Sequence, residues 1–263
     1  MTQQQKAIFL CSILFVFFII AIVMCNRNDD SDVVEIQNIQ IKSSEQNNSD
    51  VFDDYAPNIT NKNCDSLIKS NDLSLQQSNL EQWSEMDLQQ ANTAVRNNNL
   101  SKEEKQIILY TNLARLNGAK FCEMYVSPLA NRDPNNSYIK SLISDLNTVK
   151  DLPMLYPNEK LINAAKYHAK DMSTSEDIRH DSSDGTPFDK RLIKFGYNKR
   201  CGENVAGGRH DPLGVVLDLL VDEGIPDVGH RKNILDKYFN AIGVSRNTHP
   251  KYYYNFVMDF GQD

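Results

Sequence analysis

The order of its hydrophobic periodicities limits what this chain can fold into more than any other feature of the sequence. From residue 101 to residue 224 the apolar positions recur at helical spacing, and from residue 241 onwards they alternate as in a strand. Every second residue of the last expected strand falls on one face: Tyr252, Tyr254, Phe256, Met258 and Phe260. Helices first and strands last, without strand–helix–strand alternation, predict an α+β domain whose antiparallel sheet is covered by helices.

Local signals mark the ends of the expected helices. Ser101 and Glu104 form a capping box at the start of the first helix. The second helix begins at Pro157, and its apolar stripe includes His168. In the third helix we expect Pro187 at the first helical position. We expect helices at residues 101–117, 157–172, 187–196 and 211–224. We expect strands at residues 241–245 and 252–260.

The first 25 residues are expected to be a membrane segment. The apolar run over residues 7–24 reaches the length of about 18 residues at which a helix begins to span a bilayer. Lys6 precedes the run and Asp29 and Asp30 follow it, so the positive-inside tendency places the rest of the chain outside the cytosol. Because no pair of small residues marks a cleavage site, we expect an uncleaved single-pass anchor, with secretion after signal cleavage as the alternative.

Residues 26–100 are expected to be a polar, disordered linker before a globular domain at 101–263. The segment is rich in Asn, Gln, Ser and Asp, and such a composition buries too little apolar surface to offset the loss of chain entropy. A weak helical period that includes Leu88 leaves room for one short helix near its end. Trp83, the only tryptophan of the chain, is a candidate for docking on the domain.

Three separate segments of the domain supply the side chains of a candidate site. The segment 201–208, with the sequence CGENVAGG, follows His180 and precedes Gly229 and His230. Imidazoles and a carboxylate beside glycines, on segments far apart in the sequence, are typical of a site that folding assembles. We expect segment 201–208 to be a glycine-rich loop, and an alternative role for Glu203 is to accept backbone hydrogen bonds from that loop.

A set of motifs in one fixed order resembles the SCP-like domain of the CAP superfamily, which includes cysteine-rich secretory proteins, antigen 5 and plant pathogenesis-related proteins. The resemblance covers residues 101–263 and is closer to the compact bacterial-type members than to the disulfide-rich animal ones. It implies an αβα sandwich with an open cleft lined by two histidines and two acidic residues. The motifs are residues 152–155, 160–172, His180, residues 202–206, 229–235 and 260–261.

Residue by residue, the resemblance implies that His180, Glu203 and His230 line the cleft. The second acidic residue is Asp222 or its neighbour Glu223, since the motif departs from the family pattern here. The resemblance also implies that His180 and His230 hold a divalent metal. Neutral imidazole suits zinc, but two imidazoles alone predict weak, pH-sensitive binding.

Two classes of function are compatible with this site. We expect a non-enzymatic extracellular binding module for a small molecule, lipid, sterol, peptide, glycan or protein ligand. The alternative is a metal-assisted hydrolase in which Glu203 or Glu223 activates water, although the sequence has neither a Gly-x-Ser-x-Gly elbow nor a His-Glu-x-x-His helix. The net charge of -7, without a basic stripe, argues against a nucleic-acid partner.

The remaining histidines and cysteines carry weaker expectations. His168 is expected in the core, and His210 and His249 at the surface. A bridge between Cys122 and Cys201 stays open, as does a free Cys201 that acts as a nucleophile beside the cleft. A buried or bridged thiol is the more common state of such a cysteine.

Overall fold

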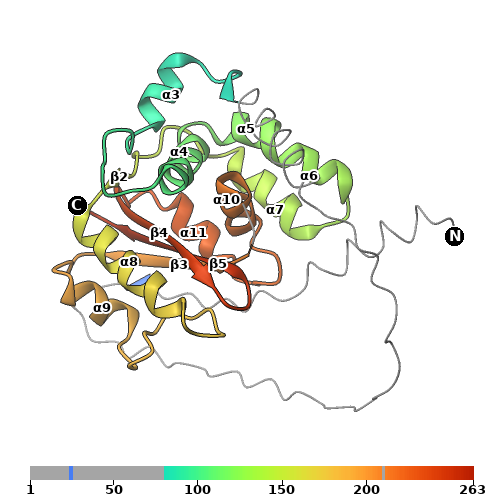
Figure 1. Ribbon diagram of the computed structural model, residues 1–263. Helices are drawn as coiled ribbons and strands as arrows, with labels where there is room; N and C mark the ends of the chain where they lie inside the picture. Colours follow the sequence, from blue (N-terminus) through green and yellow to red (C-terminus); the bar gives the residue numbers. More distant parts are fainter. Residues whose placement is uncertain (1–23, 26–79, 209–210) are drawn as a thin grey trace, which may run out of the picture. The chain divides into compact units, whose positions relative to one another are not determined.

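The computed structural model of the protein describes residues 24–25, 80–208 and 211–263 (Figure 1). Residues 83–263 all fall within one compact unit. The expected anchor, apart from residues 24 and 25, and the expected linker over residues 26–79 lie outside the described residues. Within the described ranges, no helix has the length and apolar character needed to cross a membrane.

A mixed sheet forms the centre of the fold, with the strand order β1-β3-β5-β4-β2. The strands are β1 Met24–Cys25, β2 Tyr156–Pro157, β3 Cys201–Gly207, β4 Ala241–His249 and β5 Tyr253–Gly261. The expected pair of C-terminal strands is confirmed, because β4 and β5 are antiparallel along their whole length. The sheet is not wholly antiparallel, since the short β2 runs parallel to β4.

The segment expected to be a glycine-rich loop is the strand β3, which pairs with β5 from Cys201 to Gly207. Its glycines serve close packing. A Cβ on Gly202 would lie 2.8 Å from Asn233 Oδ1, and one on Gly207 would lie 3.0 Å from the ring of Tyr252. The strand therefore places consecutive side chains on opposite faces of the sheet, which a loop would not do.

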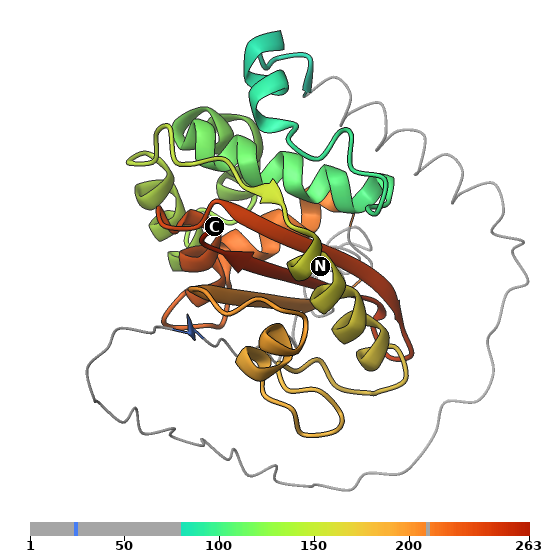
Figure 2. The same ribbon diagram turned by 90° about the vertical axis from the view of Figure 1, so that its left-hand side faces the viewer.

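Helices cover both faces of the sheet (Figures 1 and 2). They are α3 Glu85–Ala91, α4 Lys102–Leu116, α5 Gly118–Phe121, the π-helical turn η1 Cys122–Val126, α6 Ser127–Arg132, α7 Ser137–Leu146, α8 Glu159–Met172, α9 Phe188–Lys194, α10 Pro212–Val221 and α11 Gly229–Leu235. The four expected helices correspond to α4, α8, α9 and α10. In α9, however, Pro187 is the N-cap and not the first helical residue.

The predicted capping box at the start of α4 is present. Ser101 N donates to Glu104 Oε2 at 2.7 Å, and Glu104 N donates to Ser101 Oγ at 3.2 Å. Glu104 Oε1 also accepts from the backbone N–H of Arg246 at 3.0 Å. The carboxylate of Glu104, which the sequence predicts to cap α4, therefore also connects α4 to strand β4.

Helix α8 lies unusually close to the sheet at Gly243 of β4. A Cβ at this position would lie 2.1 Å from the carbonyl carbon of Leu161 and 2.3 Å from the amide nitrogen of Ile162. Leu161 and Ala164 of α8 share a buried apolar cluster with Cys201 of β3. The missing side chain of Gly243 therefore lets α8 pack directly on the backbone of the sheet.

Residues 83–100, which the sequence placed at the end of the linker, pack on the domain. Trp83 is 3% exposed, and its Nε1 donates to Tyr125 Oη at 3.1 Å. The Nζ of Lys120 lies 4.7 Å from the centre of the indole ring. The expected docking of Trp83 is confirmed, and the short helix expected near Leu88 is α3.

Candidate functional site

In the structure, four of the five predicted site residues form two pairs, and the fifth lies apart from them. His180 pairs with Glu203, and His230 pairs with Asp222. All four of these side chains are buried, whereas Glu223 is exposed. The acidic partner of His230 in this structure is therefore Asp222.

The first pair lies between β3 and the loop that leads into α9. The Nδ1 of His180 faces Glu203 Oε1 at 2.7 Å. The guanidinium of Arg191, from α9, forms an ion pair with Glu203 Oε2 and donates to the carbonyl of His180 at 2.7 Å. Burial, and then the charge of Arg191, lower the pKa of His180 to about 4, so its ring is neutral near pH 7.

A second carboxyl group stands beside this pair. Asp259 of β5 is the cross-strand partner of Glu203, and both side chains are fully buried. Burial raises the pKa of Glu203 to about 7 although Arg191 opposes the rise. Burial and the negative charge of Glu203 raise the pKa of Asp259 well above its ordinary value. The contact with Arg191 favours the charged form of Glu203 over that of Asp259.

The second pair joins the end of α10 to the start of α11. Asp222 is the C-cap of α10 and has a left-handed backbone with φ 57°. Its Oδ1 accepts from His230 Nδ1 at 2.6 Å and its Oδ2 accepts from the His230 backbone N–H at 2.9 Å. The same short loop ends at Val228, another left-handed residue, with φ 45°. One carboxylate thus fixes both the backbone and the ring of His230.

Two asparagines connect the pairs through the backbone of β3. Asn204 Nδ2 donates to the carbonyl of His230 at 3.1 Å. Asn233 Nδ2 donates to the carbonyl of Glu203 at 3.2 Å and to Asn204 Oδ1 at 2.8 Å. Glu203 and Asn204 are consecutive in a strand, so their side chains point to opposite faces of the sheet.

Each histidine keeps one ring nitrogen without a protein partner in the described part of the chain. The Nε2 atoms of His180 and His230 are both buried and accept or donate no hydrogen bond there. An imidazole in its neutral form, with Nδ1–H directed to a carboxylate, presents an Nε2 lone pair. This is the form in which histidine binds a metal ion or accepts a hydrogen bond from a ligand.

The donor set fits part of a metal site. His180 and His230 would be the metal ligands, while Glu203 and Asp222 are occupied as hydrogen-bond partners of the rings. Among the described residues no group of three or more His, Cys, Asp and Glu side chains is arranged to hold a metal ion. Any further ligands would have to come from water or a bound molecule. A divalent ion bound there would polarise a coordinated oxygen.

The other described histidines, His168 and His249, also each leave one buried ring nitrogen without a hydrogen-bond partner, but the other nitrogen of each contacts the backbone and not a carboxylate. His168 is buried in α8, and its Nε2 lies 2.7 Å from the carbonyl of Arg179, in the loop that carries His180. Burial lowers the pKa of His168 to about 3. The expectation that His249 lies at the surface is wrong, because it is 3% exposed. Its Nδ1 accepts from two backbone N–H groups of the β4–β5 hairpin. His210 lies outside the described residues.

The cysteines do not support a nucleophile at this site. Cys122 and Cys201 are both buried, and no disulfide joins the two. Cys201 packs among the apolar residues of the α8–α9 cluster. Burial also raises the pKa of the Cys122 thiol. A thiolate is the reactive form of cysteine, and an apolar environment disfavours that charge.

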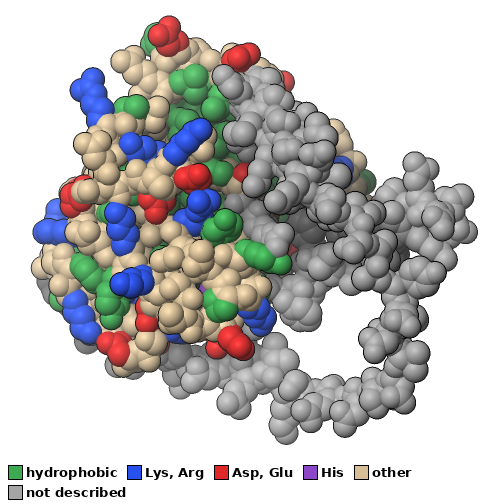
Figure 3. All heavy atoms as spheres, viewed as in Figure 1, with side chains coloured by type: hydrophobic (Ala, Val, Ile, Leu, Met, Phe, Trp, Pro, Cys, Tyr) green, Lys and Arg blue, Asp and Glu red, His purple; other side chains and the backbone are tan. Residues whose placement is uncertain are grey.

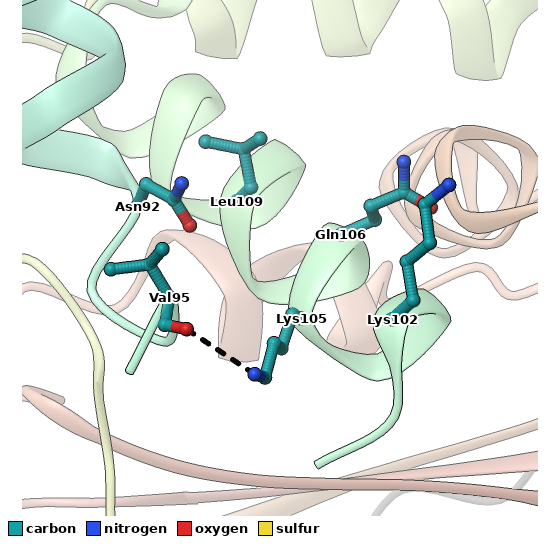
Figure 4. A pocket seen from close by; sticks show the side chains of 6 residues that line it. All are labelled: Asn92, Val95, Lys102, Lys105, Gln106 and Leu109. Atoms are coloured by element: carbon teal, nitrogen blue, oxygen red, sulfur yellow. Dashed lines mark hydrogen bonds between the residues drawn. The ribbon is translucent and has the colours of Figure 1, made fainter. Parts of the chain in front are cut away.

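Two surface features lie apart from the histidine pairs. On the face shown in Figure 3, basic and acidic side chains are interspersed, without a stripe of one sign. A shallow groove beside α4 contains none of the predicted site residues (Figure 4). Lys105, which lines the groove, donates to the carbonyl of Val95 at 3.2 Å and so binds the segment that precedes α4.

Sequence reasoning missed the residues that support the first pair. Arg191 lies within α9, where a charged residue of a short helix ordinarily faces solvent. Asp259 interrupts the apolar strand between Met258 and Phe260. A carboxylate in the middle of a strand that is apolar on both faces was the available signal for a buried partner. No comparable pattern marked Arg191.

Comparisons with known proteins agree with the architecture. The model of the cysteine-rich secretory protein family, CAP, matches residues 111–260. The uncharacterized protein YkwD of Bacillus subtilis is 34% identical over 114 residues, which is 41% of this chain and 42% of that protein. The chain therefore matches less than half of the length of this relative.

Two solved structures are also similar to the chain. An extracellular protein containing an SCP domain from Bacillus anthracis has 20% identity and a TM-score of 0.40, over 62% of this chain and 44% of that one. An outer surface protein of Borrelia burgdorferi has 23% identity and a TM-score of 0.37, over 51% of this chain and 94% of that one.

Proposed function

Because the chain belongs to the cysteine-rich secretory protein (CAP) family, we propose that it is an exported, non-enzymatic binding module whose ligand meets His180 and His230. The ligand offers a divalent cation or hydrogen-bond donors, such as the hydroxyl or amide groups of a glycan, sterol, lipid headgroup or peptide. Imidazoles that present Nε2 lone pairs select for such groups.

One observation carries this proposal. Both histidines have Nδ1 fixed by a buried carboxylate, at 2.7 Å in His180 and 2.6 Å in His230, while both Nε2 atoms are buried without a partner. Leaving a polar atom buried and unpaired costs about 1–3 kcal/mol. A fold that orients two rings by two carboxylates and leaves the same atom of each unpaired is well suited to a ligand that pairs with those atoms.

Binding is favoured over hydrolysis by the use of the acidic groups. Glu203 accepts from His180 and Arg191, and Asp222 accepts from the backbone and ring of His230. A carboxylate with its oxygens already engaged is a poor base for water. The metal-assisted hydrolase remains the second candidate, and the experiment below distinguishes it.

Export is supported by the apolar run over residues 7–24 and the acidic residues that follow it. We propose a single-pass anchor with the domain outside the cytosol. Protease added to intact cells is expected to digest the domain, and alkaline carbonate is expected to leave the chain in the membrane fraction. Recovery of a shortened chain from the medium would instead support signal cleavage.

Zinc is a suitable first probe of the proposed site. Titration of the full-length protein with Zn²⁺ is expected to show saturable binding that the double variant His180→Asn/His230→Asn loses. The Asn amide nitrogen replaces Nδ1, so the variant keeps a donor toward each carboxylate while it removes Nε2 and the outer part of the ring. Glu223→Gln is the matched control, since Glu223 is exposed, and it is expected to bind zinc as the wild type does.

Two results would contradict this account. Zinc binding that persists in the double variant would place the ion elsewhere on the chain. Zinc-dependent turnover of a peptide or ester library, lost in the double variant, would replace the binding module by the hydrolase.

A further inference from the structure

The guanidinium of Arg191 contacts the backbone of His180 directly and its ring through Glu203. One nitrogen, Nη1, donates to the carbonyl of His180 at 2.7 Å, and the other, Nη2, is paired with Glu203. Glu203 in turn faces His180 Nδ1 at 2.7 Å. These contacts form a closed ring: turning the imidazole breaks its bond to Glu203, and Glu203 is itself held in place by Arg191.

Burial makes this ring of contacts strong. Arg191 and Glu203 are 0% exposed and His180 is 4% exposed. Charge-assisted hydrogen bonds are about twice as strong as neutral ones, and water does not compete for them here. A planar guanidinium can contact a carbonyl and a carboxylate at once, whereas the single ammonium of lysine is a point charge.

The second pair is supported without Arg191, because Asn204 Nδ2 holds the carbonyl of His230 at 3.1 Å. Asp222 lies eight residues from His230 and accepts directly from both its backbone and its ring. Glu203 lies 23 residues from His180 and reaches only the ring. The backbone of His180 is held instead by Arg191. A change at Arg191 should therefore affect His180 and leave His230 as it is.

We infer that Arg191 is a positioning residue of the site, which fixes the ring of His180 and thereby the direction of its Nε2 lone pair. The inference deepens the proposed function and rests on it for the ligand. The orientation of the ring is a property of the protein alone and can be measured without any ligand.

The test is a long-range ¹H–¹⁵N NMR spectrum of the full-length protein labelled in its histidines, recorded near pH 7. In the wild type, His180 is expected as a single tautomer with a slowly exchanging proton on Nδ1. In Arg191→Lys, that proton is expected to exchange fast and the second tautomer to appear, while the His230 signals stay unchanged. Ser182→Ala is the control, because it removes only the 3.2 Å contact of Arg191 Nη1 with Ser182 Oγ.

A second variant covers the case in which Arg191→Lys does not fold. Arg191→Met/Glu203→Gln removes both charges of the buried pair together, and such replacements are often neutral for stability. The Gln amide is no longer held by a guanidinium, so mixed tautomers of His180 are expected again. An unchanged His180 spectrum in either variant that folds would overturn the inference.

Zinc titration of the same proteins separates this inference from the proposed function. If both hold, Arg191→Lys weakens zinc binding by about 10-fold or more, as is usual when a group that orients a metal ligand is removed. Ser182→Ala is expected to stay within about 2-fold of the wild type. A wild type that binds no zinc would count against the proposed function, while the His180 spectrum would still decide the role of Arg191.

Discussion

Replacement of Asp222 by Asn tests the pairing that the sequence left open between two neighbouring acidic residues. The carboxylate accepts two hydrogen bonds from His230, at 2.6 and 2.9 Å, in a buried setting. An Asn side chain has nearly the same shape and also tolerates the left-handed backbone at this position. The change therefore removes charge and one acceptor without adding backbone strain.

The expected loss of stability in Asp222→Asn follows from the two hydrogen bonds between Asp222 and His230. The Asn oxygen keeps one of them, while its NH₂ group faces the other N–H and leaves that donor unpaired. Loss of one hydrogen bond to a charged acceptor, in a buried site, costs about 2 kcal/mol. This corresponds to a factor of about 30 in the equilibrium between folded and unfolded protein. Glu223→Gln, at the exposed neighbour, should change stability by less than about 0.5 kcal/mol.

The assay is equilibrium urea denaturation of the full-length protein, followed by the fluorescence of its single tryptophan. Asp222→Asn is expected to lower the midpoint at an unchanged slope, and Glu223→Gln is expected to superimpose on the wild type. If Asp222→Asn superimposes as well, or if Glu223→Gln is the more damaging change, the assignment of Asp222 to His230 is refuted.

Three further predictions follow from the fold. Gly243→Ala should destabilise by about 1–3 kcal/mol or more in the same assay, because its Cβ would lie 2.1 Å from the backbone of Leu161, which cannot move away as a side chain can; wild-type stability would contradict the close packing of α8. Burial lowers the pKa of His168 to about 3. As the pH drops below about 6.5, His168 therefore binds a proton in the unfolded chain but not in the folded protein, and the stability of the wild type falls. Compared with His168→Gln, whose side chain does not titrate, the wild type should lose roughly 1 kcal/mol of unfolding free energy per pH unit. A stability difference between the two proteins that does not change with pH would refute this prediction. The fluorescence of Trp83, which is 3% exposed, should resist quenching by acrylamide in the folded protein, and quenching as in the unfolded chain would contradict its docking beside Tyr125.

Features determined by short stretches of sequence were predictable. The capping box of Ser101 and Glu104 depends on residues three apart, and the alternation of β5 depends on every second residue, so each can be seen without the fold. The role of Gly202 was not predictable in this way. A glycine that permits a turn and one that admits Asn233 look the same in a sequence.

The support of the site depends on contacts between distant segments. Arg191 reaches Glu203 because α9 packs beside β3, and Asp259 faces Glu203 because β5 pairs with β3 in one particular register. No local pattern sets that register. The family resemblance located His180, Glu203 and His230, but it left open which acidic side chain faces His230 and which groups hold the first pair in place.

The central claim is that the Nε2 atoms of His180 and His230 are the protein atoms that contact the ligand. The most direct measurement is anomalous diffraction from a crystal of the full-length protein grown with zinc. The account predicts zinc at about 2.0–2.1 Å from the Nε2 atoms of His180 and His230, with Glu203 and Asp222 still bound to the opposite ring nitrogens. Zinc bound elsewhere while both Nε2 atoms stay unoccupied would contradict it.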